Sequence, residues 1–152
     1  MTIAPIVRTV TVKAPPDRAF DLYVNHIADW WPCGQTVGKK PHVALVVEPR
    51  AGGRWFERDE DGAETNWGHV VAWEPPGRVL LCWQFSTSWS FDPALKTEVE
   101  LTFTPSGTGT LVALVHRNLE RFGADAGTHV ASLGNGWPTK LVQFQTYADE
   151  HL

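Results

Sequence analysis

The pattern of hydrophobic and polar positions is clearest at the end of the chain. From Gly134 to Leu152, bulky apolar residues recur at helical spacing, which predicts one amphipathic helix. Proline is tolerated in the first turn of a helix, where its missing N–H is not needed, so this helix is predicted to begin at or just before Pro138. The predicted apolar stripe contains Trp137, Leu141, Phe144, Ala148 and Leu152. The polar residues expected to point elsewhere are Thr139, Lys140, Gln143, Thr146 and Glu150.

The N-terminal part of the chain predicts a strand followed by two short helices. From Ile3 to Lys13 the residues are rich in β-branched side chains and alternate between two faces, which is typical of a strand. Prolines then end the strand and start a helix from Asp17 to about Asn25. A second helical piece is predicted from Ile27 to Trp31, and the composition of Cys33 to Pro41 predicts a loop.

The middle of the chain predicts an antiparallel meander, because turn signals rich in glycine and proline separate short alternating segments. The predicted strands are Val43 to Glu48, Arg54 to Arg58, Glu64 to Glu74, Arg78 to Phe85, Lys96 to Thr104 and Thr110 to Arg117. Ser86 to Leu95 is predicted as a polar loop that carries Trp89 and Phe91. Asn118 to Leu133 is predicted as a mobile connection with a short helix around residues 118–122.

This order of elements predicts an α+β fold in a single domain, residues 1–152. A long antiparallel sheet twists and curls, and one of its faces must be covered. We therefore expect a curved sheet of six to seven strands, with the long C-terminal helix packed across its concave face. A curved sheet and a straight helix touch along a line, so the space beside that line is either filled by side chains or left as a cavity.

Composition and charge exclude several classes of function. The net charge is −4 and Lys and Arg are not clustered, which disfavours a nucleic-acid partner. No apolar run approaches the roughly 20 residues that span a bilayer. Cys33 and Cys82 stand far apart and no signal peptide is evident, so we expect a reducing, cytoplasmic location. The histidines show no metal-ligand spacing, and no cofactor motif is present, so neither a metal nor a cofactor is expected.

The eight tryptophans and seven phenylalanines change this picture, because several of them could line a cavity under the last helix. The predicted ligand-binding walls are Trp55, Trp83, Phe85, Leu101, Phe103, Leu114, His116, Trp137, Leu141 and Phe144. His116 shares the parity of Val112 and Leu114 on its strand, so it is expected in the same interior. A histidine there is more often a hydrogen-bonded core residue, and the alternative is that it contacts the ligand and transfers a proton.

Several segments carry a resemblance to a known family. They are APPDRAFDLY at 14–23, Trp30-Trp31, EPRAGGRW at 48–55, WGHVVAWEPPGRVLLCW at 67–83, SGTGTLVALVH at 106–116 and GNGWPTKL at 134–141. Together they resemble the activator of heat-shock protein 90 ATPase homologue family, within the START-like (SRPBCC) superfamily. The resemblance implies a helix-grip fold with an apolar pocket between the sheet and the last helix. It does not imply one chemistry, because this fold hosts carriers, cyclases, hydrolases and co-chaperone domains.

Three hypotheses for function follow. The first is a binding module that holds a hydrophobic, lipid-like or aromatic, small molecule in the cavity. The second is an enzyme of cyclase or dehydratase type that acts on an aromatic or polyketide-like substrate, with His116 as acid or base. The third is a chaperone partner, a role that depends in the family on regions beyond this domain. Trp89 and Phe91 could form a homodimer interface or a lid over the pocket, and both alternatives stay open.

Overall fold

The fold is seen in a computed structural model that describes residues 3–31, 40 and 42–152. The elements in chain order are β1 (Ile6–Val12), α1 (Pro16–Val24), α2 (Ile27–Trp30), β2 (His42–Val47), β3 (Arg54–Asp59), β4 (Glu64–Glu74), β5 (Arg78–Trp83), β6 (Thr97–Ser106), β7 (Gly109–Arg117), the 3₁₀ turn η1 (Leu119–Phe122) and α3 (Ala126–Glu150). The loop predicted at Cys33 to Pro41 lies, apart from Lys40, outside the described residues. The α+β class and the order of strands and helices are as predicted.

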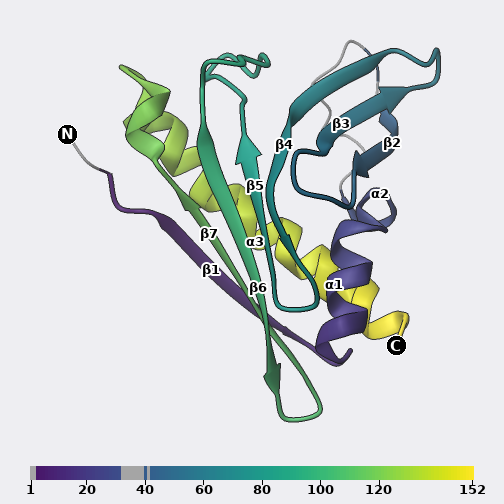
Figure 1. The fold of residues 1–152 in the computed structure, drawn as a ribbon. Helices are drawn as coiled ribbons and strands as arrows, with labels where there is room; N and C mark the ends of the chain where they lie inside the picture. Colours follow the sequence, from purple (N-terminus) through teal and green to yellow (C-terminus); the bar gives the residue numbers. More distant parts are fainter. Residues whose placement is uncertain (1–2, 32–39, 41) are drawn as a thin grey trace.

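The seven strands form one antiparallel sheet in the order β1-β7-β6-β5-β4-β3-β2. Strands β2 to β7 follow one another as a meander, and β1 pairs with β7, with Val10 opposite Val112. The sheet is curled, and α3 runs diagonally across one of its faces, with α1 and α2 beside the C-terminal end of α3 (Figure 1). This arrangement is the helix-grip fold that the resemblance implied.

The alternation along each strand decides which side chains meet α3. On β6, Val99, Leu101 and Phe103 are buried as predicted, while Glu98 and Glu100 lie on the opposite face. Those two carboxylates form ion pairs with Arg117 on the neighbouring strand, at 3.0 and 3.4 Å. These inward-facing residues of β6 therefore contribute to the apolar floor under the helix.

One end of the groove between sheet and helix is filled by α1 and α2. The ring of Phe144 on α3 packs against Tyr23 and Trp30, with centroids 4.9 and 5.1 Å apart. Phe103 on β6 meets Phe20 and Tyr23 in the same cluster, at 5.2 and 5.9 Å. The short helices thus fill this end of the groove with aromatic side chains, so any vacancy must lie toward the N-terminal half of α3.

Helix α3 is longer than predicted, and the predicted start at Pro138 is wrong. The helix begins at Ala126, so the second half of the segment predicted as a mobile connection forms its first turns. Its buried residues continue the helical spacing upstream of Trp137: Ala126, His129 and Leu133. Three glycines and a proline argue against a helix here by propensity, but packing of this stripe on the sheet overrides them. At the other end, Leu152 lies beyond the helix and is 67% exposed, so its place in the buried stripe was also wrong.

Candidate functional site

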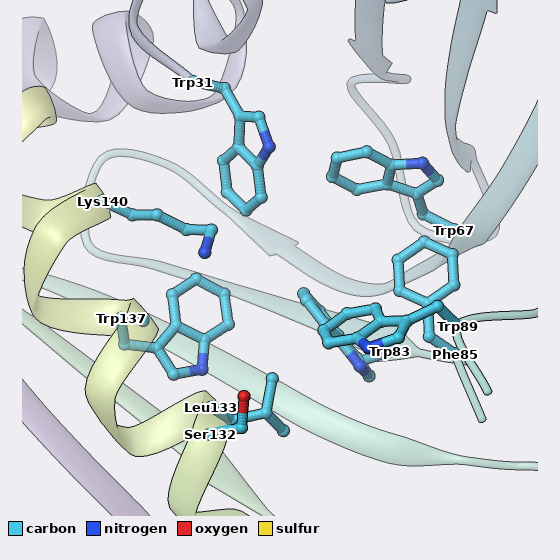
Figure 2. A pocket seen from close by; sticks show the side chains of 10 residues that line it. Trp31, Trp67, Trp83, Phe85, Trp89, Ser132, Leu133, Trp137 and Lys140 are labelled. Atoms are coloured by element: carbon cyan, nitrogen blue, oxygen red, sulfur yellow. The ribbon is translucent and has the colours of Figure 1, made fainter. Parts of the chain in front are cut away.

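A cavity of about 380 Å³ lies between the sheet and the middle of α3. It is lined by Trp31, Trp67, Trp83, Phe85, Trp89, Ser132, Leu133, Gly136, Trp137 and Lys140. Figure 2 shows the rings of this set standing around a common space, with the Lys140 side chain reaching in from α3. Its volume falls in the range of about 300–1,000 Å³ that is usual for small-molecule sites.

Helix α3 supplies half of the lining residues. Ser132, Gly136 and Lys140 are spaced by four residues and therefore share one face of the helix, and Leu133 and Trp137 lie beside them. Leu133 and Trp137 are buried, whereas Ser132 is exposed, so the mouth of the cavity lies on the side of Ser132.

Trp67 enters the cavity because of a bulge on β4. The register pairs Trp55 with Gly68 and Phe56 with Asn66, so Trp67 has no partner on β3. A bulge of this kind breaks the alternation of faces, and both Trp67 and Gly68 are buried. The indole N–H of Trp67 donates to a carboxylate oxygen of the buried Glu57 at 2.8 Å, which fixes the orientation of the ring.

Trp83 lies in register with a glycine on the neighbouring strand. Gly68 lies in register between Trp55 on β3 and Trp83 on β5, and the two indoles pack with centroids 5.7 Å apart. A β-carbon at Gly68 would lie 1.7 Å from the carbonyl oxygen of Cys82, so no other residue fits this approach of the two strands. The glycine thereby lets β4 and β5 approach closely beneath the tryptophan wall.

Behind the wall, His116 is held by hydrogen bonds at both ring nitrogens. Trp137 donates its indole N–H to Nδ1 of His116 at 3.3 Å. Nε2 lies 3.0 Å from the hydroxyl of Thr97, which itself donates to the carbonyl of Trp83. Since the indole is only a donor, Nδ1 accepts and Nε2 carries the proton. Burial, together with the nearby His129, lowers the pKa of His116 to about 3, so the ring is neutral.

Among the described lining residues, the charged one is Lys140. Its Nζ lies 5.2 Å from the ring centroid of Trp31 and 5.5 Å from that of Trp137. Burial among these rings lowers the pKa of Lys140 to about 8, which leaves it largely protonated at pH 7. The sequence pattern assigned Lys140 to the polar side of the helix. The signal that could have found it is its spacing, three residues after Trp137 on a helix that faces a curved sheet.

Trp89 forms the rim of the cavity, at the tip of the loop after β5. It is 45% exposed and its φ of 57° lies in the left-handed region, which is uncommon for a bulky residue. Its ring packs against His129 of α3, with centroids 5.1 Å apart. A second, polar cavity of about 300 Å³ adjoins this rim, lined by Thr87, Asp125, Thr128, His129 and Ser132. Trp89 was expected either in a homodimer interface or as a lid over the pocket, and a single chain does not test that choice.

The structure brings together only part of the predicted wall. Trp83, Phe85 and Trp137 line the cavity, as do Trp31 and Trp67, which sequence reasoning did not place there. Trp55 and His116 lie directly behind the lining residues, in ring contact with Trp83 at 5.7 and 5.3 Å. The remaining five predicted wall residues are buried in the core and are not among the lining residues: Leu101, Phe103, Leu114, Leu141 and Phe144. Alternation identified the inner face of each strand but not which end of the groove α1 and α2 fill.

Two further observations concern the described part of the chain alone. No group of three or more His, Cys, Asp or Glu side chains lies close enough together there to hold a metal ion. None of its helices combines the length and the apolar character needed to cross a membrane.

Comparison with known proteins gives a family match and several similar structures. Residues 13–149 match the family model described as Activator of Hsp90 ATPase homolog 1-like protein. Among proteins whose function has been curated, none matches this chain in sequence.

Two solved structures are similar in both fold and sequence. The anthrahydroquino-gamma-pyrone synthase Txn09 is 34% identical, with a TM-score of 0.67 over 95% of this chain and 97% of that one. The self-sacrificing resistance protein CalC from Micromonospora echinospora is 29% identical, with a TM-score of 0.74 over 97% and 96%. An Aha1 dimer from Colwellia psychrerythraea shares the fold at 14% identity, with a TM-score of 0.68 over 97% of each chain.

Proposed function

This chain belongs to the family of Activator of Hsp90 ATPase homolog 1-like proteins, and on that premise we propose that it binds a flat, polycyclic aromatic small molecule. The ligand lies in the cavity between the sheet and α3. The single observation that carries this proposal is the lining of that cavity, in which five indole rings and one phenyl ring face a common space. Aromatic walls favour aromatic guests, because stacked and edge-to-face contacts add to the burial of apolar surface.

Several of the rings that line the cavity are held in place by hydrogen bonds and packing, so they do not need to rearrange when a ligand binds. Trp67 and Trp137 are each held by a hydrogen bond from the indole nitrogen, to Glu57 and to His116. Trp83 packs edge-to-face on Phe85 with centroids 5.1 Å apart. Rings that are already ordered before the ligand binds lose little further side-chain entropy, so the free-energy cost of binding is smaller.

The similar structures support the choice of an aromatic ligand. Txn09 is named as a synthase of an anthrahydroquino-gamma-pyrone, a fused-ring compound, and it is 34% identical over nearly the whole of both chains. A protein of the same fold and comparable sequence thus handles a polycyclic aromatic compound. The cavity volume of about 380 Å³ accommodates a ligand of three or so fused rings by the usual size of such sites.

The proposal is tested by titrating the protein with 9-anthracenemethanol, a neutral three-ring compound, while following tryptophan emission and ligand fluorescence. We expect saturable binding at one site with a dissociation constant in the micromolar range, about −8 kcal/mol. Isothermal titration calorimetry then gives the stoichiometry.

A pair of variants on adjacent positions of α3 locates the site. Ser132→Trp places a bulky ring at the mouth of the cavity, and Ala131→Trp adds the same ring at the neighbouring exposed position, which does not line it. We expect Ser132→Trp to weaken binding at least about tenfold and Ala131→Trp to bind as the native protein does. Equal binding by both variants, or no binding to the folded native protein, would count against the proposal.

A second candidate function is catalysis on such a ligand in the same cavity, favoured by the similarity to a synthase. His116 has both ring nitrogens engaged and does not line the cavity, so it is poorly placed as a proton donor or acceptor. Among the described lining residues, the one with a titratable side chain is Lys140. Incubation with an excess of a hydroxylated anthraquinone, followed by mass spectrometry, tests for turnover. If the compound is recovered unchanged, catalysis on it is contradicted and the proposed binding function is unaffected.

A further inference from the structure

We infer that the aromatic ligand of this cavity carries an acidic group, a carboxylate or an ionised phenol, and that Lys140 binds that group. This inference rests on the proposed function and adds the charge of the ligand to it. Three features of the structure support it. They are the position of the Lys140 ammonium, the absence of a carboxylate partner for it among the described residues, and the chemistry of the other lining side chains.

The first feature is the position of the ammonium at the edge of the ligand space. Lys140 follows Trp137 by three residues, and its Nζ lies over the rings of both Trp31 and Trp137. Figure 2 shows the amine directed away from α3 and into the space that the rings enclose. Gly136, one turn earlier, has no side chain, and a β-carbon there would lie 3.5 Å from Nζ. A contact at that distance is an ordinary van der Waals contact, so the amine lies close against this turn of the helix.

The second feature is that Lys140 has no carboxylate partner within the described part of the chain. By contrast, two arginines on the sheet are paired with carboxylates: Arg58 with Glu64 at 2.7 Å, and Arg78 with Glu100 at 2.6 Å. The pKa of Lys140 is lowered by burial, with no charged neighbour contributing to the shift. A half-buried ammonium without a counterion has lost part of its hydration free energy. Cation–π contacts compensate for only part of that loss. An anion supplied by the ligand would complete the site.

The third feature is the chemistry of the remaining walls. Among the described residues that line the cavity, the side chains other than those of Lys140 and Ser132 are apolar or aromatic. The faces of the indole and phenyl rings contact the shared rings of neutral and charged polycycles alike. Among the described lining residues Lys140 carries the one full charge, so we expect discrimination by charge to come mainly from it. An ion pair in this partly dry cavity is stronger than the same pair in water.

The test uses three anthracenes of nearly the same size that differ in charge: 9-anthracenecarboxylate, 9-anthracenemethanol and 9-(aminomethyl)anthracene as its ammonium. At pH 7 we expect the native protein to bind the carboxylate at least about tenfold more tightly than the alcohol, as a charge-assisted hydrogen bond implies. The ammonium should bind more weakly than the alcohol.

Three variants assign the preference to one side chain. Lys140→Met keeps an unbranched chain without the charge, and the carboxylate and the alcohol should then bind with equal affinity. Lys140→Arg should retain the preference for the carboxylate. Lys96→Met removes the same charge from an exposed position away from the cavity and should leave the preference unchanged.

The outcomes separate this inference from the proposed function. Equal affinities of the native protein for all three compounds would overturn the inference while leaving aromatic binding intact. A preference for the carboxylate that persists in folded Lys140→Met would overturn it too, because another group would then be responsible. No binding of any of the three would overturn the proposed function itself.

Discussion

Arg8 on β1 donates a hydrogen bond from Nη2 to the carbonyl oxygen of Gly134 on α3, across 3.1 Å. Within a helix this carbonyl would accept from the N–H four residues later, but that residue is Pro138, which has no N–H. The sheet therefore supplies the donor that the helix lacks. The helix continues through Pro138, and the residues that line the cavity on both sides of this proline stay on one face.

A double-mutant cycle tests this relationship. In the native background, Arg8→Met leaves the Gly134 carbonyl without its donor, and the free energy of unfolding should fall by about 1–2 kcal/mol. In the Pro138→Ala background the helix supplies its own N–H, so the same Arg8→Met change should cost less than about 0.5 kcal/mol. Urea denaturation of the four proteins gives the coupling energy. Equal costs in both backgrounds would show that Arg8 contributes through packing alone.

His116 should make the protein sensitive to acid. The pKa of His116 is about 3 in the folded state against an ordinary value of 6.5, so between these pH values the unfolded chain binds a proton that the folded chain does not. This contribution to stability is complete above pH 6.5 and is lost as the pH falls, by up to about 1.4 kcal/mol per pH unit. In His116→Gln this dependence should be flatter. Unfolding curves measured between pH 4 and 7 check it, and parallel slopes for both proteins would contradict it.

The hydrogen bond between Trp137 and His116 can be isolated by comparing two identical substitutions. Trp137→Phe removes the donor and leaves Nδ1 of the buried histidine without a partner, a loss of about 1–3 kcal/mol beyond the change in ring size. The indole nitrogen of Trp55 is buried without a hydrogen-bond partner among the described residues, so Trp55→Phe removes no such bond. We expect Trp137→Phe to be the more destabilising by thermal unfolding. Equal losses would show that this contact contributes little.

Trp89 should contribute to binding more than to folding. Its ring covers the rim of the cavity, and its positive φ is one that glycine adopts at little cost. Trp89→Gly should therefore weaken binding of 9-anthracenemethanol about tenfold, while relief of backbone strain offsets much of the lost packing. Trp89→Phe keeps an aromatic ring and should retain most of the affinity. Titration and thermal unfolding of both variants check this, and loss of folding in Trp89→Gly would show that the ring is structural instead.

Lys140 should lower the stability of the unliganded protein. Because burial holds the pKa of Lys140 at about 8 in the folded state, below the ordinary 10.5, the unfolded chain binds more protons between these values. The penalty is complete below pH 8 and is relieved as the pH rises toward 10.5. Lys140→Met should therefore be more stable than the native protein at pH 7, by about 1 kcal/mol, and the difference should shrink at pH 10. A less stable Lys140→Met would show that the cation–π contacts outweigh desolvation.

Local patterns in the sequence were sufficient for most of the architecture. Period-two alternation placed Val99, Leu101 and Phe103 on the inner face of β6, and the turn signals separated the strands correctly. These features depend on neighbours within a few residues, so they can be read without knowing the partner of each strand. The apolar stripe around Trp137 likewise showed that a long C-terminal helix covers the sheet.

Only the tertiary structure decided where that helix begins and what the cavity contains. The donor from Arg8 is more than a hundred residues away from Gly134 along the chain, so no local pattern could show that Pro138 lies inside a helix. Trp67 enters the cavity through a bulge that breaks the alternation, and Lys140 is a cavity residue because Trp31 lies opposite it. Periodicity assigns residues to a face, whereas packing between elements distant in sequence decides which part of that face is left open.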